Sequence, residues 1–268
     1  MMGLQLRQVN KLQVLTAQNI SAPHCFTTRF GGVSRGHLES LNIGIHRGDE
    51  EENVRENYRR VCAFLGADPK GLVLSHQTHT DIVLEVGKDH WGAGLDQAEL
   101  PECDGLVTNT PGTTLVIFTA DCTPILLHDP STGAVGAVHA GWRGTVKQIA
   151  ARAVEKMQAL YGAEPKNIRA AIGPNIGMCC FETDADVPIA VKEVFGSAAD
   201  PFITKKGEKY HLDLKQINAL ALQKAGVGHI DIATECTKCQ HDRFWSHRVT
   251  GTNRGSQGAL IVCKEAEI

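Results

Sequence analysis

The sequence predicts an α+β protein whose mixed β-sheets are arranged in layers. Short β-rich runs outnumber the helix-like segments, and between residues 115 and 138 several such runs follow one another with no helix between them. This order does not fit a regularly alternating, doubly wound sheet. No stretch has the composition of an interdomain linker, and no repeat recurs at a period of about 20 to 50 residues. We therefore expect a single domain over residues 1–268.

Helices are expected where apolar residues recur at helical spacing between polar capping residues or glycines. Four segments meet this criterion: residues 50–66, 145–161, 184–195 and 213–224. Strands are expected in short runs rich in β-branched and aliphatic residues, at residues 73–75, 82–86, 115–119, 125–128, 135–138, 169–172, 230–233 and 258–262. Strands position side chains rigidly and glycine turns expose them, so we expect the functional residues where strands end.

The composition excludes several classes of function. The chain has 42% hydrophobic and 21% charged residues, as globular proteins do, and 27 Lys and Arg against 30 Asp and Glu give a net charge of −3. This balance provides no field that would attract nucleic acid or an anionic membrane. The sequence has no apolar run of membrane-spanning length, and residues 1–15 have no apolar stretch of signal-peptide length. With nine cysteines, an odd number, at least one thiol is free, and we expect a cytoplasmic protein.

Three segments, residues 75–79, 119–124 and 138–144, each place a histidine or cysteine at the end of a β-rich run. A cysteine thiolate with two imidazoles is a suitable ligand set for zinc and leaves a fourth position open, as in catalytic sites. The spacing matches no local zinc-finger pattern, and burial in the core is the alternative interpretation of any one of these residues. A second active interpretation makes Cys122 a nucleophile with His139 as its base, which would define a cysteine hydrolase.

Two further cysteine pairs and one glycine-rich loop carry weaker signals. Cys236 and Cys239 have the spacing of half a zinc ribbon or of a redox pair, but no second pair has matching spacing, so we interpret them as reduced, partly buried thiols. The vicinal Cys179 and Cys180 follow a glycine turn, and packing is the default interpretation of their thiols. Arg29 lies beside paired glycines in a loop that suits an anion, with an ordinary turn and a solvated arginine as the alternative.

Taken together, these segments resemble the YfiH-like, laccase-domain family, whose members have been described as multicopper polyphenol oxidases and as purine nucleoside phosphorylases. The resemblance runs from about residue 27 to the end of the sequence. Its carriers are TTRFGGVSRG (27–36), SLNIGIHRGDEEENVRENYRRV (40–61), HQTH (76–79), CDGLVTN (103–109), TADCTPILLHD (119–129), HAGWRGT (139–145), IGPNIGMCCFE (172–182) and FWSHR (244–248). Several such blocks in one order are far more specific than any single motif.

The resemblance implies a layered α/β/β/α fold with mixed sheets, related to deamidating toxin cysteine hydrolases. It also implies one zinc ion held by His79, Cys122 and His139. Cys122, His139, Asp121 and Arg143 are the expected catalytic residues, and Arg29, Asn42 and Gln77 are the expected substrate- or phosphate-binding residues. The family commonly has an aromatic residue in the last block where this chain has His247, which is expected to alter base or ribose contacts. We leave His76 out of the metal set, because three residues along a strand would turn it away from His79.

The implied activity is that of a zinc-dependent purine nucleoside phosphorylase acting on adenosine, inosine, guanosine and methylthioadenosine, with adenosine deaminase activity. Purine nucleosides and phosphate are the expected partners of a monomer or homodimer, and copper is the alternative metal. Besides the cysteine hydrolase, the alternatives are a copper-dependent polyphenol oxidase and a non-enzymatic peptidoglycan-editing factor. Multicopper oxidation needs many histidines in H-x-H pairs, and this chain has no such pair.

Overall fold

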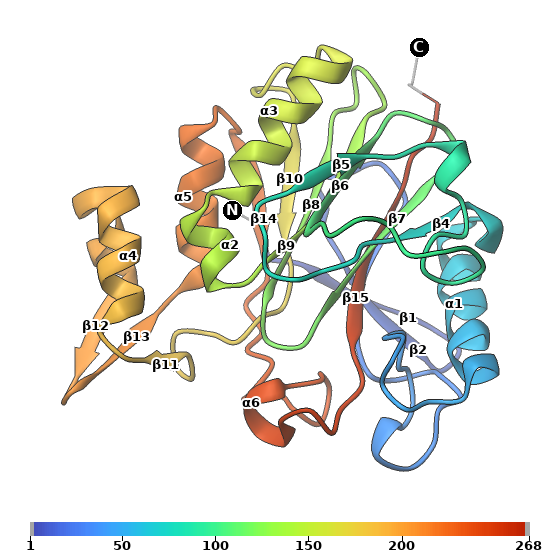
Figure 1. Ribbon diagram of the computed structural model, residues 1–268, viewed down its shortest axis with the longest axis horizontal. Coiled ribbons are helices and arrows are strands. Elements are labelled where there is room, and N and C mark those ends of the chain that lie inside the picture. Colours follow the sequence, from blue (N-terminus) through green and yellow to red (C-terminus); the bar gives the residue numbers. More distant parts are fainter. Residues whose placement is uncertain (1–2, 266–268) are drawn as a thin grey trace.

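The computed structural model describes residues 3–265 and contains two six-stranded mixed sheets packed face to face (Figure 1). In the first sheet only β4 and β7 are parallel neighbours, and all other neighbours are antiparallel. Its strands, in spatial order, are β1 (Gln5–Val9), β2 (Leu12–Thr16), β3 (His24–Thr27), β15 (Gln257–Val262), β7 (Thr114–Thr119) and β4 (Leu72–Leu74).

The second sheet has an antiparallel centre and one parallel pair at each edge, β14 with β10 and β6 with β5. Its strands, in spatial order, are β14 (His229–Ile232), β10 (Arg169–Ile172), β8 (Thr123–His128), β9 (Val135–Ala140), β6 (Gly105–Thr108) and β5 (Val83–Glu85). Because β7 and β8 are consecutive but belong to different sheets, the short turn between them carries the chain from one layer to the other.

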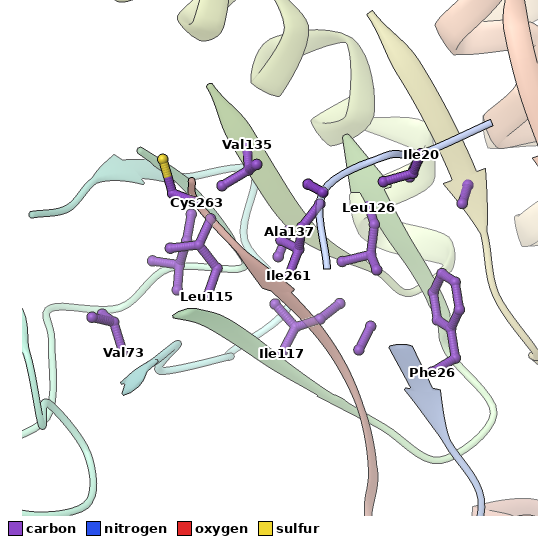
Figure 2. Packing of buried hydrophobic residues seen from close by; sticks show 14 of the residues in the cluster. Ile20, Phe26, Val73, Leu115, Ile117, Leu126, Val135, Ala137, Ile261 and Cys263 are labelled. Atoms are coloured by element: carbon purple, nitrogen blue, oxygen red, sulfur yellow. The ribbon is translucent and has the colours of Figure 1, made fainter. Parts of the chain in front are cut away.

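Alternation along the strands builds the core between the sheets. Leu115 and Ile117 of β7 point inward and meet Leu126 of β8 and Ala137 of β9 (Figure 2), whereas Val116 points outward. This two-residue period is what a strand that is buried on both faces requires.

Helices cover the outer faces of both sheets. The apolar face of α1 (Glu51–Leu65) packs on the first sheet, and Gly66 ends this helix at a φ of 64°. The second sheet is covered by α3 (Ile149–Tyr161) and α5 (Leu214–Lys224). The layers therefore follow the order helix, sheet, sheet, helix, which confirms the expected α+β fold with mixed sheets.

A small three-stranded sheet lies beside these layers and packs against α5 (Figure 1). It contains β11 (Glu182–Thr183), β13 (Lys209–Leu212) and β12 (Ile203–Lys206), and is accompanied by α4 (Asp186–Phe195) and the 3₁₀ segment Gly196–Phe202. The remaining elements are α2 (Trp142–Val146), α6 (His247–Thr250) and the 3₁₀ turns Gly36–Leu38, Pro69–Gly71 and Lys88–His90.

The structure differs from the expected elements in two respects. The helix expected over residues 145–161 is two helices, because Gln148 adopts the left-handed conformation with a φ of 58° between α2 and α3. Several strands were not expected, namely β1, β2, β3, β6 and the small sheet. No helix within residues 3–265 combines the length and apolar character needed to span a bilayer.

Candidate active site

The three expected metal ligands meet where the chain passes between the two large sheets. His79 lies on the connection from β4 to β5, and Cys122 lies on the turn from β7 to β8, so both connections run from the first sheet to the second. His139 lies near the end of β9, next to β8 in the second sheet. Side chains that are 17 to 60 positions apart in the sequence are thus brought to one point by the sheet topology.

The geometry of these three side chains fits a single metal ion. Their ligand atoms all lie within 4.8 Å of one another. The Cys122 sulfur is 3.9 Å from Nε2 of His79, and the two imidazole rings meet edge to face with their centroids 5.0 Å apart. Gly141 leaves the necessary space, because a Cβ atom there would be 2.8 Å from the His79 ring and 3.3 Å from the Cys122 sulfur. Two imidazoles and one thiolate are borderline-soft donors that suit zinc.

Asp104, a member of the CDGLVTN block, holds two of these candidate ligands in place. Its fully buried carboxylate accepts a hydrogen bond from Nδ1 of His139 at 2.7 Å and another from the His79 amide at 3.1 Å. The Thr80 amide and hydroxyl donate to its second oxygen at 2.6 and 2.8 Å. With Nδ1 occupied, His139 presents Nε2 to the site, which is the usual outer partner arrangement of a metal-binding histidine.

The electrostatics of the metal-free site favour a thiolate. Burial alone would raise the pKa of the Cys122 thiol, but His139 and His79 outweigh burial and lower this pKa to about 6. Burial disfavours the charged form of His139, whereas the facing thiolate and Asp104 raise the His139 pKa to about 9. The same partnership overcomes burial at Asp104 and lowers its pKa to about 2. A soft, ionised sulfur is therefore available for a metal or for nucleophilic attack.

The donor atoms open into a cavity of about 520 Å³, a volume within the range of small-molecule sites. Apolar and aromatic groups, including Phe118, Trp142 and Phe181, form part of its wall. Three arginines, Arg47, Arg248 and Arg254, also line it. None of these arginines was expected at the site from the sequence, although Arg47 and Arg248 lie inside motif blocks that carry the family resemblance.

Arg254 lines the cavity, and its surroundings disfavour the charged form of its guanidinium group. Burial and the neighbouring Arg47 lower the pKa of its guanidinium to about 10, against the opposing effects of Asp121 and Cys122. Its Nη1 donates to the Gly255 carbonyl at 2.9 Å, whereas its buried Nε has no hydrogen-bond partner within residues 3–265. Two nearby cations with an unsatisfied donor make a site that an anion would stabilise.

The structure places two other expected arginines outside the cavity wall. Arg29 does not line the cavity: its guanidinium stacks on the Trp245 ring at 4.1 Å and donates to the carbonyls of Glu39 and His241. Arg143 is exposed, lies over the Trp142 ring at 4.4 Å and is likewise absent from the cavity wall. Both guanidinium groups lie on aromatic faces, and that of Arg29 also has local carbonyl partners, which sequence spacing does not reveal.

Asn42 supports the site from behind. It is fully buried away from the cavity wall, and its amide accepts hydrogen bonds from the Gly44 and Ser256 amides at 3.0 Å each. Gln77 does line the cavity, but its side-chain amide is paired with both backbone groups of Phe118, at 2.6 and 2.8 Å. Asn42 therefore braces two segments of the wall, and Gln77 fixes the end of β7.

Asp121 lines the cavity at a φ of 86°, directly before Cys122. Its carboxylate accepts hydrogen bonds from the Thr237 hydroxyl at 2.6 Å, the Ser246 hydroxyl at 3.0 Å and the Arg248 amide at 2.7 Å. This group connects the metal-ligand turn with two C-terminal loops. An aspartate with a left-handed backbone between two strands is the local signal of such a turn.

Two histidines near the metal ligands have different places. His76 lines the cavity, but its Nδ1 pairs with the Leu100 carbonyl at 3.1 Å, outside the metal group. The expected reason for omitting it was wrong, because Thr78 and His79 form a bend rather than a strand and His79 has a φ of 65°. His247 lines the cavity, as its place in the FWSHR block suggested.

The two remaining cysteine pairs meet in space. The sulfurs of Cys179, Cys180, Cys236 and Cys239 all lie within 4.8 Å of one another; we call them the thiol cluster. The premise that Cys236 and Cys239 lack a second ligand pair was therefore wrong. The partner pair is vicinal and lies more than 50 residues upstream, so a search for matched spacing could not find it.

The fold and the donor set define a class of protein: a layered α+β protein with a His–Cys–His group that could hold a metal ion between two sheets. The family model described as multi-copper polyphenol oxidoreductase laccase matches residues 23–264, and the chain belongs to this family.

Several relatives of known structure or name are similar over most of their length. The purine nucleoside phosphorylase YlmD of Geobacillus stearothermophilus is 37% identical over 241 residues, which cover 88% of this chain and 87% of the relative. The crystal structure of YlmD from the same organism matches with a TM-score of 0.91 at 34% identity and covers 98% of this chain and 99% of that chain. A protein named adenosine deaminase RL5, from an unknown prokaryotic organism, is 34% identical over 245 residues, with coverages of 89% and 93%.

Proposed function

We propose that this protein is a zinc-dependent purine nucleoside phosphorylase that accepts adenosine, inosine, guanosine and methylthioadenosine and also deaminates adenosine. One observation carries the proposal: a single cavity contains the His–Cys–His donor set and also the adjoining guanidinium groups of Arg47 and Arg254. A nucleoside has apolar ring faces and polar edges, and the wall offers it Phe118, Trp142 and several polar groups.

In the proposed phosphorolysis, a phosphate oxygen attacks C1′ of the ribose while the bond from C1′ to the purine nitrogen breaks. The base leaves with a proton, and the second product is the sugar 1-phosphate, which is ribose 1-phosphate or, from methylthioadenosine, methylthioribose 1-phosphate. Arg47 and Arg254 bind and orient the phosphate, since guanidinium groups keep their charge and pair with phosphate through two parallel hydrogen bonds. In the proposed deamination, water attacks C6 of adenosine and ammonia leaves.

His79, Cys122 and His139 would hold the zinc ion, and Asp104 would fix the orientation of His139. When bound, zinc supplies electrophilic polarisation and favours ionisation of water beside it. Oxidation of polyphenols by several coppers is not proposed, because within residues 3–265 the only other group of potential ligands is the thiol cluster, which contains no histidine.

The phosphate site is tested by substituting Arg254 with methionine. We expect Arg254→Met to raise the phosphate KM for inosine cleavage about 10- to 100-fold, which corresponds to the loss of one charged hydrogen-bond pair. Adenosine deamination, which needs no phosphate, should change much less. The matched control is Arg152→Ala, whose exposed side chain lies outside the cavity, and it should leave the phosphate KM within two-fold.

Two results would overturn these assignments. Equal losses of phosphorolysis and deamination in Arg254→Met would remove the phosphate role of Arg254. If zinc-replete protein showed no phosphate-dependent cleavage of any of the four nucleosides, the phosphorylase proposal itself would be wrong.

A second candidate function is favoured by one observation. The Cys122 thiolate faces the His139 imidazolium, which in turn donates to the Asp104 carboxylate. This spatial order of nucleophile, base and orienting carboxylate is the arrangement of a cysteine hydrolase. Mass spectrometry of the protein during turnover distinguishes the two functions. A covalent adduct on Cys122 would support the hydrolase, whereas the phosphorylase leaves Cys122 unmodified.

A further inference from the structure

The thiol cluster lies outside the cavity and has no role in the proposed reaction. Its four sulfurs come from two loops, one after β10 and one after β14. The Cys239 sulfur is 3.6 Å from that of Cys179 and 3.4 Å from that of Cys180. In a tetrahedral zinc site with bonds of about 2.3 Å, neighbouring sulfurs are about 3.8 Å apart. These two distances are close to the edge of such a tetrahedron, and the other sulfurs of the cluster lie within 4.8 Å of one another.

The backbone around the thiol cluster is shaped to hold sulfur. Gly177 donates its amide to the Cys236 sulfur at 3.2 Å, and a Cβ atom at this glycine would come within 3.4 Å of the Cys179 sulfur. A β-bridge between Asn175 and Cys236 joins the two loops, and the Thr237 amide donates to the Asn175 carbonyl at 2.9 Å. Amide donors aimed at sulfur stabilise a thiolate, as they do in known metal–thiolate sites.

A buried cation already lies beside the cluster. The ammonium group of Lys215 donates to the Glu235 carbonyl at 2.9 Å and lies near enough to Cys236 and Cys179 to interact with their charge. One lysine would not balance four thiolates, whereas a divalent metal bound among them would offset most of their charge.

We propose that the thiol cluster is a structural zinc site with four thiolate ligands. It has no open coordination position for substrate, so its role is to fasten the two loops together. Both loops border the cavity: Ile176 and Phe181 lie in its wall, and Thr237 donates its hydroxyl to the Asp121 carboxylate. The site thus fixes the wall of the cavity and the residue before Cys122 without touching the reacting atoms.

Metal content tests the proposal. Zinc is measured by elemental mass spectrometry in the full-length protein, purified reduced and without chelators. We expect Cys239→Ser to contain one zinc equivalent fewer than the wild type, whatever the His–Cys–His centre holds, and Cys263→Ser, a buried cysteine outside both groups, to match the wild type. Equal zinc in Cys239→Ser and wild type would overturn the site, and iron at the cluster would overturn the identity of the metal.

A second measurement needs no substitution and stays decisive if Cys239→Ser fails to fold. Cys179 and Cys239 are exposed, whereas Cys25, Cys62 and Cys263 are buried. Without metal, the exposed thiols should react rapidly with iodoacetamide, and bound zinc should slow this reaction at least ten-fold until a strong chelator is added. Peptide mass spectrometry reads each cysteine separately, with the buried cysteines as internal controls. Rapid alkylation before chelation, or a disulfide within the cluster in native protein, would contradict the proposal.

Replacing zinc with cobalt shows how many thiolates bind the metal, because cobalt–thiolate bonds give a charge-transfer absorption. Cobalt in the cluster has four thiolate ligands, against one at the His–Cys–His centre, so its charge-transfer absorption should be about four-fold stronger. We expect Cys122→Ala to retain the strong band and Cys239→Ser to lose it. The reverse pattern would overturn the assignment.

Discussion

At the scale of single residues, Asp104 shows how a side chain outside the cavity wall can position the groups that line the cavity. Its carboxylate pairs with Nδ1 of His139 and also with four donors of the 78–80 loop, which includes His79. One buried charge therefore determines the position of two ligands on two different elements. An asparagine cannot do the same. Both carboxylate oxygens of Asp104 accept hydrogen bonds, whereas the NH2 group of an asparagine only donates and would face the N–H or O–H donors that one of these oxygens now pairs with.

We predict that Asp104→Asn weakens zinc binding at the His–Cys–His centre about 10- to 100-fold, the usual cost of losing an outer partner of a ligating histidine. The measurement is a competition titration against a chelator of known affinity. The same titration on Cys122→Ala, which lacks one of the three candidate ligands, measures the zinc that is bound outside this centre. Thr80→Val, which removes one hydroxyl donor from the same carboxylate and leaves His139 untouched, should cost much less. Wild-type affinity in Asp104→Asn would contradict the positioning role.

The meeting of the three candidate ligands could be expected from the sequence, but much around them could not. His79, Cys122 and His139 each follow a β-rich run, and the family resemblance named the same three residues. The contacts of Asp104 and Arg254 could not be anticipated, although Asp104 lies in the CDGLVTN block, because they arise only when distant segments meet. Arg29 shows the opposite case: a local glycine-rich pattern suggested an anion site, whereas the folded chain supplies Trp245 and two carbonyls to this guanidinium.

At the scale of elements, the break between α2 and α3 is the clearest departure from local expectation. Helical periodicity continues through residues 145–161, but Gln148 adopts a left-handed conformation that L-residues other than glycine disfavour. Its side chain makes no capping hydrogen bond to α3. The turn reorients the chain so that α2 stays beside β9 while α3 runs across the second sheet.

We predict that Gln148→Gly stabilises the protein by about 1 kcal/mol, because glycine removes the left-handed penalty. The same substitution at the exposed Gln158, inside α3, should destabilise it by about 1 kcal/mol, since glycine is a poor residue for a helix interior. Urea unfolding of both variants measures the two effects. Destabilisation by both substitutions to a similar extent would show that Gln148 is not strained.

Among the strands that escaped prediction, β1 and the pair β12 and β13 share a physical reason. Most of β1 is exposed and carries Gln and Arg side chains, so it has no apolar alternation. The pair β12 and β13 contains lysines and lies in the small sheet. Such strands form because a neighbouring strand already offers hydrogen-bond partners, and this information lies elsewhere in the chain.

At the scale of the whole molecule, a buried histidine sets part of the acid stability. His128, at the end of β8, is 6% exposed, and its Nδ1 has no partner within residues 3–265. Burial is the main reason that its pKa falls to about 4, and His24 and Arg169 lower it further against the influence of Asp129. The folded protein therefore keeps this imidazole neutral where an unfolded chain would protonate it.

The sign of the pH dependence follows from this difference. Above pH 6.5 neither state is protonated at His128, and its contribution to stability is complete. Between pH 6.5 and 4 the unfolded chain binds a proton that the folded protein does not, so stability falls as the pH falls, by about 3 kcal/mol at most. We predict that His128→Leu flattens this part of the stability curve in metal-free protein.

Urea unfolding at pH 7 and pH 4.5 measures the effect, and His229→Leu is the matched control, because it removes an exposed histidine of β14. If both variants followed the wild-type slope, His128 would have no part in the acid sensitivity. Metal-free protein is required, since acid also displaces zinc from histidine and cysteine ligands.

The position of β15 determines when the first sheet can be completed during synthesis of the chain. This strand lies between β3 and β7, near the middle of the first sheet, yet it follows β3 by about 230 residues (Figure 1). At roughly 5 to 20 residues per second, a ribosome needs on the order of 10 to 50 seconds to bridge that interval. During this interval β3 lacks its neighbour β15, as does β7 once residues 114–119 have been made, and such unpaired edges can pair with other chains. The first sheet, and with it the packing of the two layers, is completed only after residue 262 has left the exit tunnel.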